Sequence, residues 1–322
     1  MTDHTVVVTD HDFEDLFIER EGLADVAEVV ELTNDVGGSA ADARETLAEA
    51  DAVINLRCDL DAESVALLDD CQVISRYGIG VDNIATDAAR ERSIPVTNVP
   101  DYCLEEVSIH ALSLWLALSR GLPTYDDAVA AGDWDRSAAA PIHRLSTRTV
   151  GVVGYGAIGR AVGERAAALG ADVLASDPFL SPADVANDPA ELVSFETLLD
   201  CADFVTVHSP LTPDTRELFD ADAFSRMRDD AYFVNVARGP IVDTEALVAA
   251  LDAGELAGAG LDVFPEEPPA TTDPLRDHPD VVTTPHVAWY SEEANEERRR
   301  TVVDIVRTTL EGGEPYNVVN EE

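Results

Sequence analysis

Lysine is absent from this sequence of 322 residues, and all 21 basic side chains are arginines. They stand against 64 acidic residues, so the formal net charge is −43. A chain this acidic is repelled by phosphate backbones and anionic lipids, which argues against nucleic acid and membranes as partners. Yet 46% of the residues are hydrophobic, whereas disordered chains lack such residues. The sequence therefore predicts a folded protein.

The excess of acidic residues also predicts the solvent in which the protein works. Repulsion among so many carboxylates destabilises a compact fold in dilute buffer. In molar salt the Debye length falls to about 3 Å, and most of this repulsion is screened. We therefore expect a protein adapted to a salt-rich cytoplasm, as in halophiles. An ordinary acidic protein is the alternative.

Cysteine and long apolar runs are scarce as well. The four cysteines have no C-x-x-C spacing, so we expect reduced thiols and no metal site. No apolar stretch approaches the length of a membrane span, and the first residues lack the basic segment of an export signal. These features predict a cytoplasmic protein.

Short apolar runs alternate with helical patterns along most of the chain. Strands are expected at 6–8, 29–32, 52–56, 73–75, 95–98, 149–153, 173–176, 204–208, 232–236, 259–263 and 281–284. Helices are expected at 41–49, 62–68, 84–92, 105–119, 158–169, 195–199, 221–227, 244–253 and 292–310. This alternation predicts an α/β fold with two doubly wound parallel-sheet domains, of Rossmann or flavodoxin type, and a cleft between them.

A glycine motif, Gly154-Tyr155-Gly156-Ala157-Ile158-Gly159, joins a predicted strand to a predicted helix. In this context the first glycine permits a tight turn, the second lets the backbone approach a pyrophosphate, and the third lets helix pack on strand. Asp177 ends the next apolar run; its carboxylate can accept hydrogen bonds from ribose hydroxyls and would repel a 2′-phosphate. The motif therefore predicts NAD rather than NADP. A purely structural turn is the minority alternative.

Arg238, Glu267 and His286 each follow a short apolar run. Because the carboxyl ends of parallel strands lie at one edge of a sheet, these side chains are expected to meet there. The planar guanidinium suits a carboxylate, and an imidazole beside a carboxylate suits acid–base catalysis. Each residue alone has an ordinary alternative: a structural ion pair, a solvated surface charge or a structural histidine.

Taken in order, the glycine motif, Asp177, Asn-x-x-Arg-Gly, Asp-Val-Phe-x-x-Glu-Pro and Pro-His resemble the D-isomer-specific 2-hydroxyacid dehydrogenases. Residues 99–106 and 285–292 are most similar to the C-terminal-binding-protein branch of that family. The resemblance implies reversible reduction of a small 2-oxo acid to a D-2-hydroxy acid with NADH. The competing interpretation is a dimeric, NAD(H)-sensing regulatory scaffold with little turnover.

The resemblance also implies roles for individual residues. Arg238 would bind the substrate's carboxylate and carbonyl, His286 would transfer the proton, and Glu267 rather than Glu266 would orient His286. The expected cofactor contacts are Gly154, Gly156, Ala157, Ile158, Gly159, Asp177, His208, Ser209, Pro210, Thr215, Val236, Ala237 and Asp262. The expected substrate contacts are Arg57, Tyr77, Gly78, Ile79, Gly80 and Trp289. One departure is Val107, which stands where many relatives carry a hydroxyl residue near the nicotinamide.

A discontinuous first domain follows from the same resemblance. Residues 1–101 with 292–322 would form the substrate domain, and residues 102–291 the NAD-binding domain. The substrate would bind in the cleft between them, with closure excluding water. A homodimer is expected, formed through the nucleotide domain and the predicted helix at 105–119.

We expect the unfolding temperature and the activity to rise steeply between about 0.1 M and about 1 M KCl, because carboxylate repulsion is screened over that range. Screening should level off once the Debye length nears contact distance. A stronger hydrophobic effect should instead keep growing and depend on the anion, so chloride and sulfate series separate the two causes. Full stability in dilute buffer without ligand would contradict the predicted salt adaptation.

Overall fold

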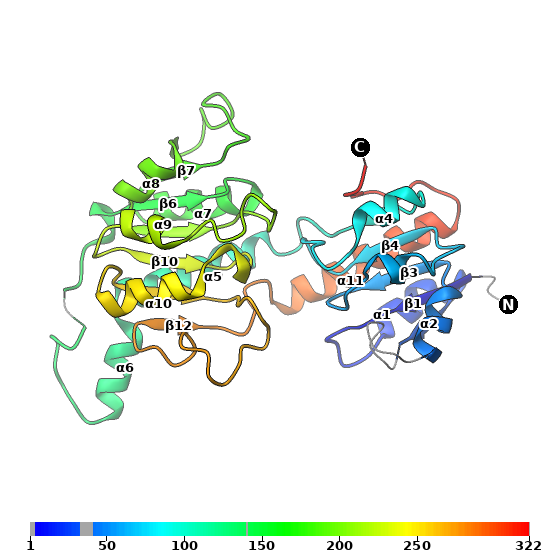
Figure 1. Ribbon diagram of the computed structural model, residues 1–322, viewed down its shortest axis with the longest axis horizontal. Helices are drawn as coiled ribbons and strands as arrows, with labels where there is room; N and C mark the ends of the chain where they lie inside the picture. Colours follow the sequence, from blue (N-terminus) through cyan, green and yellow to red (C-terminus); the bar gives the residue numbers. More distant parts are fainter. Residues whose placement is uncertain (1–3, 33–40, 140, 322) are drawn as a thin grey trace. The chain divides into compact units, whose positions relative to one another are not determined.

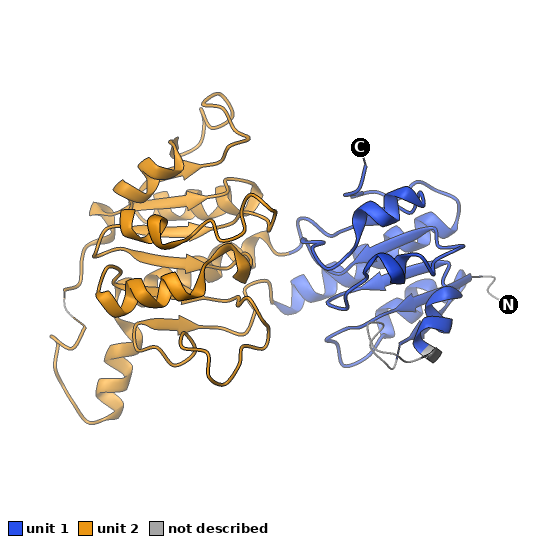
Figure 2. Cartoon of the chain, in the orientation of Figure 1, with its two compact units in different colours: residues 1–102, 291–322 blue, residues 103–290 orange. Residues whose placement is uncertain are grey.

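The computed structural model describes residues 4–32, 41–139 and 141–321. The chain forms two compact units, shown in Figure 2. Unit 1 contains Met1–Tyr102 and Ser291–Glu322, and unit 2 contains Cys103–Tyr290. The division expected from the sequence differs from this one by a single residue at each boundary.

Unit 1 is built on a five-stranded parallel sheet with the strand order β2-β1-β3-β4-β5. Its strands are β1 (His4–Val8), β2 (Ala27–Glu31), β3 (Ala52–Asn55), β4 (Val73–Arg76) and β5 (Val96–Thr97). Its helices are α1 (Phe17–Leu23), α2 (Ala41–Ala48), α3 (Ala62–Val65), α4 (Thr86–Glu91) and α11 (Glu292–Leu310), most of them labelled in Figure 1. The central strand β3 is buried along its whole length, because helices cover both faces of the sheet.

Helix α11 returns from the far end of the sequence to pack against α1 and β4. A buried ion pair holds it there. The Glu19 carboxylate is fully buried and accepts hydrogen bonds from Arg299 Nε at 2.9 Å and Nη2 at 2.6 Å. The Tyr77 hydroxyl donates a third, at 2.9 Å. Burial, followed by the neighbouring Glu19 charge, raises the pKa of Tyr77 well above its ordinary value.

Unit 2 is built on a seven-stranded sheet with the order β12-β11-β10-β9-β6-β7-β8, also parallel throughout. Its strands are β6 (Thr149–Val153), β7 (Asp172–Ser176), β8 (Ala190–Leu192), β9 (Phe204–Val207), β10 (Tyr232–Asn235), β11 (Gly258–Leu261) and β12 (Val281–Thr283). Its helices are α5 (Leu104–Ser119), α6 (Leu122–Ala130), α7 (Ala157–Ala168), α8 (Phe195–Cys201), α9 (Ala221–Arg226) and α10 (Thr244–Ala253), with 3₁₀ turns η1 (Leu145–Thr147) and η2 (Gly239–Ile241). The strand order reverses between β6 and β9, which is where sheets of this type bind ligands.

The prediction of two doubly wound parallel-sheet domains is confirmed. Every expected strand is present, within two residues at either end. Elements β8, α1 and α6 were not predicted. Helix α6 buries none of its residues, so it has no core-facing stripe that would reveal it. Strand β8 is a three-residue edge strand, and the seven residues of α1 are too few for a clear helical period.

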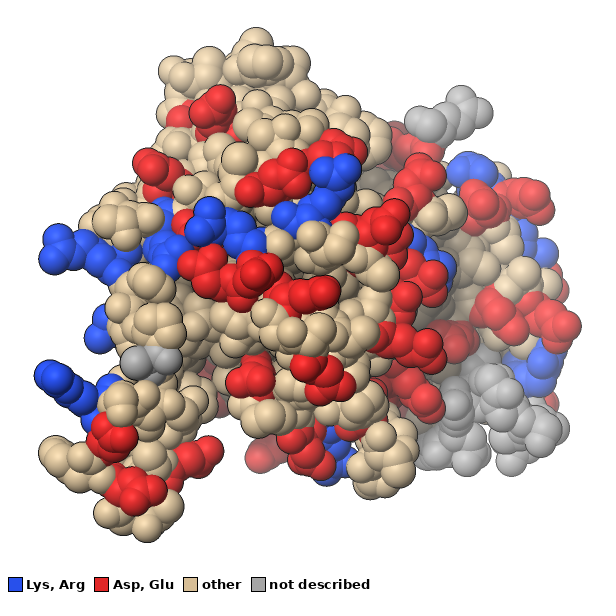
Figure 3. All heavy atoms as spheres, turned by 60° about the vertical axis from the view of Figure 1, so that its left-hand side comes forward, with Lys and Arg blue, Asp and Glu red and all other residues tan. Residues whose placement is uncertain are grey.

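Acidic side chains are spread over the surface of unit 2, and arginines lie among them in the view of Figure 3. Exposed ion pairs form at several points, including Arg226 with Asp200 and Arg300 with Glu296. With 21 arginines and 64 acids, one-to-one pairing cannot neutralise the surface. Among the helices of the described residues, none has both the length and the apolar character needed to cross a bilayer.

The buried pair at α11 should contribute far more to stability than the exposed ones. Glu19→Gln leaves the Arg299 guanidinium buried beside a neutral amide, so we expect a loss of about 3 kcal/mol or more in the free energy of unfolding. As a matched control, Arg300→Gln breaks a pair whose partners are both more than half exposed, and should cost less than about 1 kcal/mol. Denaturant titration at constant molar salt measures both, and equal losses would contradict the assignment.

Candidate active site

The glycine motif lies at the point in unit 2 where the strand order reverses. Gly154 follows β6 with φ +84°, and a Cβ there would lie 2.7 Å from the backbone nitrogen of Ser209, in the loop after β9. A Cβ on Gly159 would lie 2.2 Å from the carbonyl oxygen of Gly154. A Cβ on Gly156 would meet nothing within 4 Å. The first and third glycines therefore permit close packing, and the second borders open space at the N-terminus of α7.

Asp177 follows β7 and is fixed beside this turn. Its two carboxylate oxygens accept hydrogen bonds from the backbone nitrogens of Tyr155 at 2.9 Å and Phe179 at 3.0 Å. A carboxylate has about four acceptor sites, so capacity remains for a ligand's hydroxyls. The arrangement suits a dinucleotide, with backbone N–H groups for phosphate and a held carboxylate for ribose.

The loop after β9 faces the same turn. His208 Nε2 lies 3.0 Å from the Thr206 hydroxyl, and burial lowers the pKa of His208 to about 3. The imidazole is therefore neutral near pH 7. The Thr215 hydroxyl donates to the carbonyl oxygen of Pro210 at 2.7 Å and accepts from the backbone nitrogen of Thr212 at 2.8 Å. These bonds give the segment from His208 to Thr215 a defined shape.

Arg238, Glu267 and His286 follow β10, β11 and β12, which are neighbours in the sheet. Asn235, at the end of β10, holds the Arg238 loop: its side-chain nitrogen donates to the Arg238 carbonyl oxygen at 2.9 Å, and its side-chain oxygen accepts from Ala237 N at 3.0 Å. Asn235 was quoted in the sequence motif without a role. The sequence feature that could have indicated this role is an amide side chain at the end of an apolar strand.

The Arg238 and Glu267 loops touch at Gly239. A Cβ on that glycine would lie 2.0 Å from the carbonyl carbon of Phe264 and 2.3 Å from the backbone nitrogen of Pro265. Only a residue without a side chain permits this approach of two backbones. Gly239 therefore sets how the guanidinium-bearing loop lies against the carboxylate-bearing loop.

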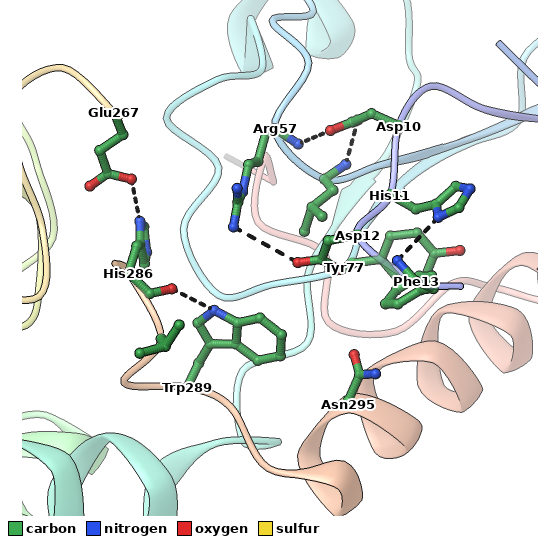
Figure 4. Close-up of polar contacts among 12 residues, drawn as sticks. Asp10, His11, Asp12, Phe13, Arg57, Tyr77, Glu267, His286, Trp289 and Asn295 are labelled. Atoms are coloured by element: carbon green, nitrogen blue, oxygen red, sulfur yellow. Dashed lines mark hydrogen bonds and ion pairs between the residues drawn. The ribbon is translucent and has the colours of Figure 1, made fainter. Parts of the chain in front are cut away.

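Glu267 and His286 form a short charge-assisted contact, visible in Figure 4. Nδ1 of His286 lies 2.5 Å from one carboxylate oxygen of Glu267, and the other oxygen accepts from the backbone nitrogen of Phe264 at 3.0 Å. The side chain of His286 remains 33% exposed and that of Glu267 35% exposed. With Nδ1 engaged, Nε2 is the ring nitrogen left to meet a ligand.

The backbone of His286 is in the left-handed region, with φ +55°. This conformation is uncommon for a residue other than glycine, and it persists only where surrounding contacts enforce it. One such contact comes from Trp289, whose indole nitrogen donates to the carbonyl oxygen of His286 at 3.0 Å. Trp289 was expected to contact substrate; the structure gives it this bond within the loop.

Asp262 lies beneath the same loop. Its carboxylate accepts hydrogen bonds from the backbone nitrogens of Val287 at 2.9 Å and Ala288 at 2.8 Å, and from the Thr284 hydroxyl at 2.5 Å. Its side chain is fully buried. The sequence predicted a cofactor contact here; in the structure, three donors from the loop occupy the carboxylate.

In unit 1, Gly78, Ile79 and Gly80 follow β4. The carbonyl oxygens of Gly78 and Ile79 accept hydrogen bonds from Val99 N and the Asn98 side chain, at 3.1 Å and 2.7 Å. Within the part of the chain that the structure describes, the N–H groups of these three residues have no acceptor. Consecutive backbone N–H groups without an acceptor are donors that an anion can use.

Tyr77, which was expected to contact substrate, is buried in unit 1. Its N–H donates to the Asn55 carbonyl oxygen at 2.9 Å, its carbonyl oxygen lies 3.4 Å from an Arg298 nitrogen, and its hydroxyl is buried on Glu19. No donor of Tyr77 is left for a substrate, because this residue joins β4 to α11. The polar groups of Tyr77 therefore serve the packing of unit 1, and its expected contact with substrate stays a prediction.

Arg57 follows β3, and the N–H groups of Leu56 and Arg57 donate to the Asp10 carboxylate at 3.0 Å and 2.6 Å. The Arg57 side chain is 61% exposed, and its Nη2 lies 3.8 Å from Oδ2 of Asp12. A dashed line joins the two residues in Figure 4. In unit 2, Val107 is buried in α5 and offers no polar side-chain group. Val236 is buried after β10, and Ala237 is half-buried beside it.

Comparison with known proteins identifies the family. Residues 112–288 match the family described as "D-isomer specific 2-hydroxyacid dehydrogenase, NAD binding domain". The glycerate dehydrogenase of Methylorubrum extorquens is 38% identical over 275 residues, which cover 83% of this chain and 84% of that protein. This chain belongs to the D-isomer-specific 2-hydroxyacid dehydrogenase family.

Other relatives extend the comparison. A D-3-phosphoglycerate dehydrogenase of Mycobacterium bovis is 40% identical over 273 residues, 84% of this chain and 51% of the relative. The chain thus spans about half the length of several curated relatives it matches. The crystal structure of D-lactate dehydrogenase from Aquifex aeolicus, complexed with NAD and lactic acid, superposes with a TM-score of 0.88 at 28% identity, covering 95% of this chain and 96% of that one.

The contact at Gly239 yields a prediction. Because an added Cβ would collide with backbone, Gly239→Ala should displace the Arg238 and Glu267 loops and lower kcat/KM by about 10²-fold, the scale expected for a misplaced site. Steady-state kinetics with a 2-oxo acid measures the loss. Gly22→Ala in unit 1 is the control: its Cβ would meet a Val303 side chain at 2.4 Å, so it should lower stability without lowering kcat/KM. Equal kinetic losses would contradict the prediction.

Proposed function

We propose that this protein reduces a small 2-oxo acid to the D-2-hydroxy acid with NADH, and catalyses the reverse reaction. The observation that carries the proposal is the 2.5 Å contact between His286 and Glu267. This contact lies at the carboxyl ends of the strands, where Arg238 also lies. Membership of the hydroxyacid dehydrogenase family supports it.

The cofactor proposal is NAD, and the residues of unit 2 fit it. The space beside Gly156 leaves room for a pyrophosphate against the N-terminus of α7. The carboxylate of Asp177 is held where it can accept hydrogen bonds from ribose hydroxyls. When bound, NADH would supply a hydride to the carbonyl carbon of the substrate.

The protein's own groups would bind the substrate and deliver the proton. Arg238 would clamp the carboxylate with its planar guanidinium and polarise the ketone. His286 would donate its Nε2 proton to the ketone oxygen as negative charge develops there. Glu267, in contact with Nδ1, would hold the imidazole in one orientation.

We further propose that the row of N–H groups from Gly78 to Gly80 contributes to carboxylate binding, and that Arg57 lies toward the remainder of the substrate. Gly78 is buried and Ile79 and Gly80 are half-buried, and their N–H groups support the first assignment; the exposed side chain of Arg57 supports the second. Relatives are named phosphoglycerate, glycerate and D-lactate dehydrogenases. The acids in these names all carry a 2-hydroxy acid group, which is the part that Arg238 would bind.

A homodimer in a salt-rich cytoplasm completes the proposal. Exposed Leu122, Val129 and Trp134 in or near α6 support association through unit 2, and the net charge of −43 supports salt adaptation.

The second candidate function is an NAD(H)-sensing scaffold like members of the C-terminal-binding-protein branch. The intact pairing of His286 with Glu267 favours the enzyme, because a scaffold has no use for a proton donor.

Two substitutions test the proposal. His286→Asn removes the proton donor, so turnover of a 2-oxo acid should fall by about 10²-fold or more while NADH binding is retained. Arg238→Lys keeps the charge and loses the planar fork, so both KM and kcat should suffer. Initial rates of NADH oxidation at molar salt, with NADH affinity from fluorescence, give these quantities.

A panel of substrates provides the controls. An uncharged ketone should be reduced far more slowly than the matching oxo acid, since it cannot use Arg238. NADPH should serve less well than NADH, because Asp177 would repel its 2′-phosphate. Wild-type protein that binds NADH but reduces no 2-oxo acid would favour the scaffold instead.

A further inference from the structure

A hydrogen-bonded chain connects α5 to the loop that carries His286. His110, in the second turn of α5, places Nε2 3.0 Å from the Thr284 hydroxyl oxygen. The same oxygen lies 2.5 Å from Oδ1 of Asp262. The proposed reaction assigns no task to His110 or Thr284.

The direction of each bond follows from the chemistry of the groups. Backbone N–H groups of Val287 and Ala288 can only donate, so both oxygens of Asp262 act as acceptors. The Thr284 hydroxyl donates its one proton to that carboxylate. Its oxygen is then the acceptor toward α5, and Nε2 of His110 must carry a hydrogen. The sequence of donors is therefore His110 to Thr284 to Asp262.

Asp262 holds the His286 peptide from both sides. Its backbone carbonyl oxygen accepts from the His286 nitrogen at 2.8 Å, and its carboxylate accepts from the two residues that follow His286. These bonds flank the one residue of the loop with a left-handed backbone. The direction of the His286 ring thus depends on the position of the Asp262 carboxylate.

The same chain links the two segments through which the polypeptide enters and leaves unit 2. Helix α5 begins one residue after the first crossing, at Tyr102–Cys103, and the His286 loop leads to the second, at Tyr290–Ser291. Thr284 lies between these two segments. Its hydroxyl group is hydrogen-bonded both to His110 of α5 and to the Asp262 carboxylate. A donor on α5 can therefore fix the start of the catalytic loop.

We propose that His110 and Thr284 are positioning residues for His286, acting through the buried Asp262 carboxylate. This inference rests on the proposed role of His286 as proton donor. It assigns the two residues no contact with substrate or cofactor. Their loss should therefore reduce kcat while leaving NADH affinity intact.

Paired variants separate hydrogen bonding from packing. Thr284→Val keeps the shape but removes the hydroxyl, and should lower kcat by about 10-fold or more; Thr284→Ser keeps the hydroxyl and should stay within about threefold of wild type. His110→Met should lower kcat similarly, whereas His110→Gln, whose amide nitrogen can reach the position of Nε2, should restore most of it. The neighbouring Thr283→Val is the control, because no hydrogen bond of the Thr283 hydroxyl occurs among the described residues.

A double-mutant cycle tests whether the effect passes through His286. In a His286→Asn background, Thr284→Val should lower the residual turnover by less than about twofold, since the group it positions is gone. Its effect on unfolding temperature should be the same in both backgrounds. A purely structural role would instead give equal kinetic losses with and without His286.

Amide hydrogen exchange gives a readout independent of turnover. Thr284→Val and His110→Met should speed exchange at Val287 and Ala288, with the strands of unit 2 unchanged. If wild-type protein reduces no 2-oxo acid, the proposed function fails, while exchange still tests the connection. Unchanged exchange together with kcat within about twofold of wild type in both variants would overturn the inference. Should Thr284→Val not fold, the two variants of His110, whose side chain is 22% exposed, carry the same test.

Discussion

Parallel strand pairing is the constraint on which the site depends. Strands β10, β11 and β12 lie side by side and run in one direction, so their carboxyl ends reach the same edge of the sheet. Arg238, Glu267 and His286 are far apart in the sequence, yet each follows one of these ends. The same geometry in unit 1 gathers Asp10, Arg57 and Gly78 after β1, β3 and β4. The sheet thus brings the functional side chains together at its carboxyl end, and the loops adjust their final positions.

Refinement is carried out by side chains that accept hydrogen bonds from loop backbone. Asp10 holds the loop after β3, Asp177 holds the glycine turn, and Asp262 holds the loop of His286. Asn235 does the same for the Arg238 loop. A loop crossing the end of a sheet leaves N–H groups without strand partners, and a fixed carboxylate satisfies two of them at once. In a chain dominated by surface acids, these few are structural.

The sequence reveals features whose signal is local. The strands of both sheets, the glycine motif and the three residues at strand ends are visible because period, spacing and neighbouring turns lie within a few residues. Contacts between distant segments leave no such trace. The family resemblance implied a substrate contact for Tyr77, but its hydrogen-bond partners Glu19 and Arg298 come from the distant helices α1 and α11. Asp262 and His110 are connected through hydrogen bonds to Thr284. The local sequence pattern gives no sign that Thr284 lies near either residue.

The charge of the chain has a second consequence for the proposed reaction. A 2-oxo acid is an anion, and it must approach a protein with a net charge of −43 to reach Arg238. In dilute buffer the field of the surface carboxylates extends about 10 Å or more and opposes that approach. At molar salt the field is confined to about 3 Å, while a bidentate contact with a guanidinium acts at hydrogen-bond distance and is screened far less. Salt would therefore favour substrate binding as well as folding, because it removes the long-range repulsion and leaves the short-range attraction at the site.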